Sequence, residues 1–279
     1  MNNDISPASA PRSKDTLALR VASALVLGPA AIGASWVGGP LFAGLVAFLC
    51  VLMAFEWSRM IERAELTPVF FALGLGGAGA LILAAGERYE LAFIVCAASG
   101  AAAAAAAIWG SGNWRWAAFG AAYFIAPSVA LIWLRESAED GRGFLILLFA
   151  VVWSADTGGY VGGRLVGGPK LSPKISPAKT WAGAVGGLIA GGIAAALGAP
   201  YLLGEAANAS HIAMGAGLGL ASILGDMAES AFKRHFGIKD MSGFIPGHGG
   251  VLDRLDGMIF ATAAVTAVLY GHSLLAGHG

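Results

Sequence analysis

The sequence predicts an all-α, polytopic integral membrane protein with about nine transmembrane helices. Hydrophobic residues make up 57% of the 279 residues and charged residues only 12%, whereas a soluble domain usually carries about 25% charged residues. Long uncharged runs recur along the whole chain, and roughly 20 apolar residues in a helix span the hydrocarbon core. Because the runs are continuously apolar and do not alternate, they favour helices over a β-barrel.

A polar segment precedes the apolar runs. Residues 1–16 are expected to form a disordered cytosolic leader, and no clear small-residue cleavage site ends the first run, which favours a retained helix over a signal peptide. Glycines gather in the third and seventh runs, where they predict close helix packing. The expected spans cover residues 18–38, 40–57, 68–86, 90–109, 114–134, 143–163, 181–203, 208–228 and 254–275.

Lys and Arg lie mostly on one side of the predicted membrane. With the N-terminus in the cytosol, all but three of the 17 fall in cytosolic segments, and the exceptions are Arg88, Arg135 and Arg142. The positive-inside rule therefore predicts a cytosolic N-terminus and a C-terminus outside the cytoplasmic membrane. The net charge of zero points to no nucleic-acid partner. Cys50 and Cys96 sit in apolar runs and are expected to be inert buried thiols.

Polar residues divide the rest of the chain into an N-terminal transmembrane bundle, residues 17–142, and a catalytic transmembrane region, residues 143–279. The bundle carries little chemistry. Glu56, Glu62 and Glu65, at and after the end of its second span, are expected to be solvated or interfacial charges. The acids and cations that can form a site come later in the chain, and the active site is expected at the cytosolic face.

Asp156 lies inside the sixth span, and an acid at this depth is costly and usually functional. A carboxylate hydrogen-bonded to neighbouring helices is the alternative. The loop that follows carries Lys170, Lys174 and Lys179, which alone are typical of residues that anchor a membrane surface. Lys179 and Thr180, however, stand at the start of a helix, where backbone N–H groups favour phosphate.

Four acids gather around the last two spans. Asp226 and Glu229 are three residues apart, so on a helix they share a face. Asp253 and Asp256 repeat this spacing at the start of the ninth span. Such carboxylates suit Mg²⁺, which binds one or two carboxylates together with substrate phosphates. Glu229 can instead form a structural ion pair with Lys233, four residues further on.

His248 lies between glycines just before the ninth span. It can bind phosphate or transfer a proton, and a turn histidine without a role is the alternative. Acids for a metal, with basic groups for anions, on one face of a membrane predict phosphoryl or nucleotidyl transfer. The place of the site in a membrane predicts that one substrate is a lipid.

The segments that hold these residues resemble a known family. The run from Ser230 to Asp256 carries Lys-Arg, Lys-Asp and then Ile-Pro-x-His-Gly-Gly-x-x-Asp-Arg-x-Asp, which looks like the signature of the phosphatidate cytidylyltransferases, or CDP-diacylglycerol synthases. Ser-Ala-Asp-Thr-Gly-Gly-Tyr around Asp156 and Ile-Ser-Pro-x-Lys-Thr-Trp before Ala182 also match, in the expected order. Ala182 itself departs from the pattern, since many relatives carry an acid or amide there.

The resemblance implies a Mg²⁺-dependent reaction in which CTP and phosphatidic acid give CDP-diacylglycerol and pyrophosphate. It also implies a homodimer in the cytoplasmic membrane and, in some members, a monovalent cation such as K⁺ beside the Mg²⁺. The expected metal ligands are Asp156, Asp226, Asp253 and Asp256; the expected catalytic residues are Asp226, Asp253, Asp256, Lys233 and His248; and the expected substrate-binding residues are Lys179, Thr180, Ser230, Arg234, Lys239 and Arg254.

Three other functions fit part of the sequence. A transporter would use intramembrane acids to bind a coupling ion, but these acids cluster on one face and no inverted repeat is visible. A CDP-alcohol phosphotransferase is also a Mg²⁺ enzyme acting on lipids, and it carries an Asp-Gly-x-x-Ala-Arg motif. In this chain Asp256-Gly257 is not followed by the arginine that this motif requires. A structural membrane scaffold would leave the acidic cluster unexplained.

Overall fold

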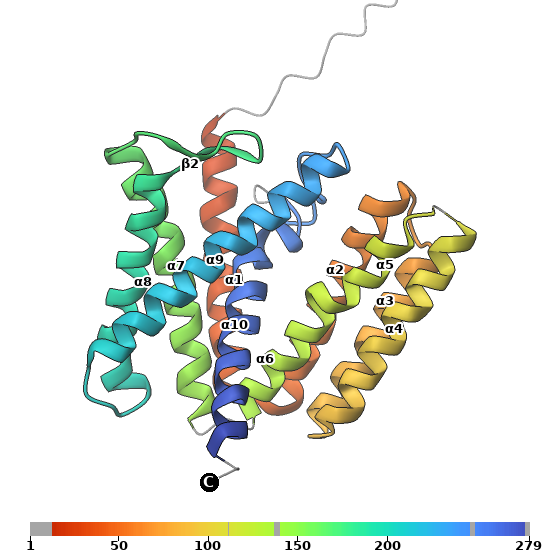
Figure 1. Cartoon of the computed structure of the whole chain (residues 1–279), viewed down its shortest axis with the longest axis horizontal. Coiled ribbons are helices and arrows are strands. Elements are labelled where there is room, and N and C mark those ends of the chain that lie inside the picture. Colours follow the sequence, from red (N-terminus) through yellow and green to blue (C-terminus); the bar gives the residue numbers. More distant parts are fainter. Residues whose placement is uncertain (1–12, 111, 137–139, 246–248, 277–279) are drawn as a thin grey trace, which may run out of the picture.

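The computed structural model describes residues 13–110, 112–136, 140–245 and 249–276, which form a bundle of helices (Figure 1). Of the expected leader, residues 1–12 lie outside the described residues and the last four belong to the first helix. The elements are α1 (Ser13–Val37), α2 (Gly39–Glu62), α3 (Pro68–Ala85), α4 (Tyr89–Trp109), α5 (Trp114–Gly120), the π-helix η1 (Ala121–Ile125), α6 (Ala126–Glu136), α7 (Gly141–Leu165), β1 (Lys170–Ser172), β2 (Ser176–Thr180), α8 (Trp181–Leu202), α9 (Ala209–His235) and α10 (Leu252–Ala276).

The prediction of an all-α membrane protein is confirmed. Within the described residues, seven helical segments are long and apolar enough to cross a membrane, namely α2, α3, α4, the continuous rod α5–η1–α6, α7, α8 and α9. The helices α1 and α10 occupy the first and last expected spans. In α1 the apolar segment found among the residues whose side chains are described is Leu25–Val37, which is shorter than the other seven. The expected count of nine spans is therefore approximate.

A small β-hairpin interrupts the helical pattern between α7 and α8. Its strands β1 and β2 are antiparallel, and Lys170 pairs with Thr180. The sequence predicts only a basic loop here. The hairpin lies at one end of the bundle, beside the start of α8 (Figure 1). It leads the chain directly into α8, because Thr180 is both the last residue of β2 and the N-cap of that helix.

The predicted close packing of the glycine-rich seventh span is confirmed. In α8, a Cβ on Gly186 would lie 2.6 Å from the backbone oxygen of Gly158 in α7. A side chain does not fit at that distance, so the two helices meet backbone to backbone. The helices α7 and α8 in turn form one wall of the site described below.

The N-terminal bundle shares its core with the catalytic region. Trp57 of α2 is fully buried, and its ring lies 5.6 Å from that of Phe232 in α9 and 5.1 Å from that of Tyr123 in η1. Its Nε1 donates a hydrogen bond to the backbone oxygen of Trp116 at 3.0 Å. These contacts fix α9, which carries Asp226 and Glu229, against a helix from the first part of the chain.

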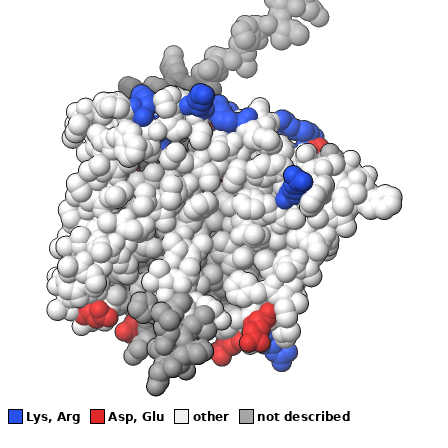
Figure 2. Space-filling view, viewed as in Figure 1, with Lys and Arg blue, Asp and Glu red and all other residues white. Residues whose placement is uncertain are grey.

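Charge is distributed unevenly between the two ends of the bundle. On the face shown in Figure 2, Lys and Arg gather along the end that carries the hairpin, and most of the visible acids lie at the opposite end. The middle of this face is covered by uncharged residues. This arrangement is typical of a protein whose central band contacts lipid.

Candidate active site

A cavity of about 670 Å³ opens at the hairpin end of the bundle, between α7, α8, α9 and α10. It contains most of the residues that the sequence assigns to a site, although these come from four separate segments of the chain. The predicted site residues that line it are Asp156, Lys179, Thr180, Asp226, Lys233, Asp253, Arg254 and Asp256.

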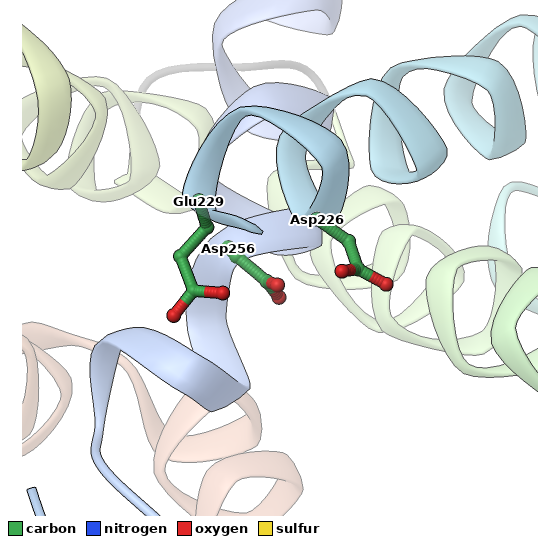
Figure 3. A group of neighbouring side chains, drawn as sticks. All are labelled: Asp226, Glu229 and Asp256. Atoms are coloured by element: carbon green, nitrogen blue, oxygen red, sulfur yellow. The ribbon is translucent and has the colours of Figure 1, made fainter. Parts of the chain in front are cut away.

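Three carboxylates in this cavity form a compact group. Asp226 and Glu229 lie on successive turns of α9, and Asp256 comes from α10 (Figure 3). One carboxylate oxygen from each lies within 4.8 Å of the others. Glu229 is buried, and its Oε1 has no hydrogen-bond partner among the described residues. An unsatisfied buried oxygen is costly, so this group of acids fits a cation as its missing partner.

Lys179 carries positive charge to the edge of the acidic group. Its Nζ lies 2.6 Å from Oδ2 of Asp226, while Oδ1 of Asp226 accepts a longer hydrogen bond from Ser230 at 3.5 Å. Asp156 of α7 accepts a hydrogen bond from Ser222 at 3.3 Å. Its carboxylate lines the cavity, so the hydrogen-bonded alternative and a functional role are both compatible with its position.

Lys233 connects two acids on the other side of the cavity. Its Nζ lies 2.7 Å from Oε2 of Glu229 and 2.7 Å from Oδ1 of Asp253. The pair with Glu229 is the ion pair that the sequence offered as an alternative. Both carboxylates are nearly inaccessible, with 2% and 7% of their side-chain surfaces exposed. Buried acids of this kind need such a partner.

Asp253 uses its second oxygen to hold the backbone. Its Oδ2 accepts hydrogen bonds from the N–H of Met241 at 3.1 Å and from the N–H of Gly250 at 2.8 Å. An acid in the first turn that binds the N–H just before its own helix stabilises the helix start. The compact group of three therefore contains Glu229 where the sequence expected Asp253, and metal binding by Asp253 stays a prediction.

Thr180 has a local structural role. Its Oγ1 accepts a hydrogen bond from the N–H of Gly183 at 3.1 Å, which caps α8, and the residue is buried. The cap explains how the sequence starts a helix at this point. It also holds Lys179, one residue earlier, at the edge of the cavity.

Other predicted residues lie outside this group. Ser230, Arg234 and Lys239 are not among the residues that line the cavity, although Ser230 reaches it through Asp226. Arg234 and Lys239 are exposed on the same end of the molecule. His248 lies outside the described residues.

The prediction for Glu56 is wrong. The residue is fully buried in α2, and its carboxylate accepts hydrogen bonds from the backbone N–H groups of Val251 and Leu252, each at 2.8 Å. The Ser242 hydroxyl donates a third, short hydrogen bond. The signal was present in the sequence, because Glu56 falls inside the expected second span and a buried intramembrane acid needs partners.

Fold and cavity together define a polytopic membrane protein with a mixed acidic and basic pocket at one end of its helices. Comparison with known proteins identifies the family. The model of the cytidylyltransferase family matches residues 18–272. The phosphatidate cytidylyltransferase of Brucella suis is 37% identical over 261 residues, covering 88% of this chain and 91% of the relative. That of Pseudomonas aeruginosa is 34% identical over 265 residues, covering 90% and 96%.

The chain therefore belongs to the cytidylyltransferase family. This membership confirms the resemblance seen in the sequence motifs. It decides against a transporter, a CDP-alcohol phosphotransferase and a structural scaffold, none of which is a cytidylyltransferase.

Proposed function

We propose that this chain transfers the cytidylyl group of CTP to phosphatidic acid, giving CDP-diacylglycerol and pyrophosphate for membrane phospholipid synthesis. The observation that carries the proposal is the pocket itself. It combines the carboxylates of Asp226, Glu229 and Asp256 with the cations of Lys179 and Lys233 at the end of a membrane-spanning bundle. A nucleoside triphosphate can enter such a pocket from water, while a lipid phosphate reaches it from the bilayer.

In this reaction a phosphate oxygen of phosphatidic acid attacks the α-phosphorus of CTP. The bond between that phosphorus and the oxygen bridging to the β-phosphate breaks, and pyrophosphate leaves with the electron pair. The attacking phosphate monoester is largely ionised near neutral pH, because its second pKa is about 6. The pocket therefore needs no strong general base, and its main tasks are positioning and charge neutralisation.

The group of Asp226, Glu229 and Asp256 fits Mg²⁺, and these residues would hold it. Their oxygens are hard ligands grouped within 4.8 Å, of the type that Mg²⁺ prefers, and Oε1 of Glu229 has no other partner among the described residues. When bound, Mg²⁺ neutralises charge on the triphosphate and on the departing pyrophosphate. Asp156 is proposed to serve a second, monovalent cation such as K⁺.

The basic residues are proposed to bind phosphates. Lys179 has an acidic partner in Asp226, with 22% of its side chain exposed in the cavity, so an incoming phosphate reaches its ammonium group. Arg254 lines the same cavity, and a guanidinium binds phosphate in a bidentate manner. Lys233 is more enclosed between Glu229 and Asp253, and we assign it to orienting these two acids beside the reacting phosphates.

We further propose that the hairpin end faces the cytosol, that the membrane is the cytoplasmic membrane, and that the chain is a homodimer. The orientation is supported by the Lys and Arg that gather at this end (Figure 2) and by the positive-inside rule. It gives the pocket access to cytosolic CTP. The homodimer remains an expectation from the resemblance in sequence.

The test is transfer of label from α-labelled CTP into the lipid phase by purified protein in detergent. Wild-type protein is expected to transfer label only when phosphatidic acid and Mg²⁺ are both present. Glu65→Gln, a charge change at an exposed position outside the pocket, is expected to behave as wild type. A folded preparation that transfers no label to any lipid phosphate would refute the proposed function.

A further inference from the structure

We propose that Glu56 is a positioning residue for the reaction, through which the N-terminal bundle sets the geometry of the catalytic helix α10. Its carboxylate binds the turn that precedes α10, and that turn fixes Asp253 and hence Lys233 in the pocket. The role in the reaction rests on the proposed function. The structural part, that Glu56 holds the turn, does not.

Three donors converge on the carboxylate of Glu56. The N–H groups of Val251 and Leu252 donate to its Oε1 and Oε2, each at 2.8 Å, and the hydroxyl of Ser242 donates to Oε1. The first N–H groups of a helix have no partner within it and carry partial positive charge. A carboxylate from α2 therefore caps α10, almost 200 residues further along the chain.

Gly250 shows how closely this turn is seated on Glu56. A Cβ at residue 250 would lie 2.5 Å from Oε1 of Glu56, so only glycine allows the backbone to approach this far. The side of Gly250 that faces Glu56 has no room for a water molecule. Direct contact with the carboxylate thus holds the turn.

The same turn is also bound by an acid of the pocket. The N–H of Gly250 donates to Oδ2 of Asp253, while Oδ1 of Asp253 contacts Lys233. Glu56 and Asp253 therefore bind neighbouring N–H groups of a single turn. Releasing the turn from Glu56 frees Asp253 to shift, and Lys233 and Glu229 lose a fixed neighbour.

The proposal is tested with Glu56→Gln, which keeps the shape of the side chain but replaces one acceptor oxygen with an NH₂ group that faces a donor. Glu65→Gln is the matched control, since it makes the same chemical change at an exposed position just after the same helix. Two quantities are measured in each variant. They are the hydrogen-exchange rates of the amides of Val251 and Leu252, and the kcat and KM for CTP.

Glu56→Gln is expected to speed exchange at both amides about tenfold or more and to lower kcat about 10- to 100-fold, the range seen when a residue that orients a ligand is lost. KM for CTP is expected to change less than kcat, because the phosphate-binding residue Lys179 lies on β2 and only Arg254 lies on α10. Glu65→Gln is expected to match wild type in all these quantities. Wild-type exchange or wild-type kcat in Glu56→Gln would overturn the proposal.

A milder variant covers the case in which Glu56→Gln does not yield folded protein. Ser242→Ala removes one of the three donors and leaves the carboxylate in place, so a smaller change in the same direction is expected in exchange and in kcat. No change in either would overturn the proposal. If wild-type protein makes no CDP-diacylglycerol, the proposed function fails, whereas the exchange rates still report whether Glu56 holds the turn.

Discussion

The acids of the pocket differ in what already binds them. Asp253 has both oxygens occupied, by Lys233 and by two backbone N–H groups. Glu229 shares Lys233 through one oxygen and leaves the other without a partner among the described residues. The oxygen left for a cation is therefore Oε1 of Glu229, with oxygens of Asp226 and Asp256 grouped within 4.8 Å of the Glu229 carboxylate, whereas Asp253 chiefly orders the backbone beside this group.

This difference predicts that Asp256→Asn reduces catalysis through metal binding. Loss of one charged ligand removes several kcal/mol of charge stabilisation, which corresponds to at least about a hundredfold lower kcat. Binding of Mn²⁺, followed by electron paramagnetic resonance of the free ion, is expected to weaken in parallel. Asp140→Asn, an exposed aspartate at the start of α7, is the control and should change neither quantity. Normal Mn²⁺ affinity in Asp256→Asn would exclude Asp256 as a ligand.

Lys233→Met should be more damaging to the fold than substitution of the other lysines. It leaves the buried carboxylates of Glu229 and Asp253 without their shared cation, and breaking a buried pair in this way costs about 3 kcal/mol or more. Thermal unfolding in detergent measures the effect, with Lys174→Met as the control because Lys174 is exposed on the hairpin. Equal melting temperatures in the two variants would contradict the assignment.

Sequence reasoning found the acids of the catalytic region but misjudged Glu56. Asp156, Asp226 and Asp256 stand out because each lies at or near membrane depth in an apolar run. The donors to Glu56 lie more than 180 residues away, and no local pattern connects them. The four-residue spacing between Glu229 and Lys233 predicted their ion pair. That the second carboxylate oxygen of Glu229 has no partner among the described residues depends on how α10 packs, which the spacing does not reveal.

At the level of elements, hydropathy located the helix ends to within five residues, with the largest of these differences at the start of α1 and the end of α2, and missed the end of α9 by more. This helix continues to His235, beyond the apolar run that was expected to end at residue 228. Its last two turns are held by aromatic contacts and ion pairs, which hydropathy does not register. The sequence did not predict the hairpin, because its strands have only three and five residues and β2 contains a proline, so no clear alternation of apolar and polar residues is visible.

The backbone contact between α7 and α8 predicts a steep penalty for a larger side chain at Gly186. Gly186→Val is expected to separate the two helices and to destabilise the protein by about 1–3 kcal/mol, as overpacking does, with loss of activity because α7 and α8 wall the pocket. Gly217→Val makes the same change on α9, where a Cβ would meet nothing within 4 Å. The two variants are compared by thermal unfolding. Equal stability would show that the helices can move apart freely.

For the molecule as a whole, the described parts of the two expected regions, residues 17–142 and 143–279, pack against each other. Trp57 packs on α9 and Glu56 caps α10, so the N-terminal bundle is part of the support of the site. Composition predicted the membrane class and motifs predicted the pocket. The contacts between the two regions could not be predicted from the sequence. They join buried residues that lie far apart along the chain, and no sequence pattern relates them.

The proposed orientation predicts which end of the molecule is accessible from outside the cell. Cys50 and Cys96 are buried, so single introduced cysteines can be labelled with little background. A membrane-impermeant maleimide is expected to label Ala206→Cys, in the loop between α8 and α9, in intact cells, and Lys174→Cys only in inverted vesicles. The reverse pattern would place the pocket outside and exclude cytosolic CTP as its substrate.

The cap that Glu56 places on α10 also bears on how the protein is made. During synthesis α2 is made early, whereas Val251 and Leu252 are made near the end of the chain. The Glu56 carboxylate therefore lacks these two donors until nearly the whole remaining chain has been synthesised. The last helix brings both Asp256 and the backbone that satisfies Glu56, so it completes the pocket and the buried core in one step. A nascent chain that ends before α10 thus lacks both Asp256 and the two backbone donors to Glu56.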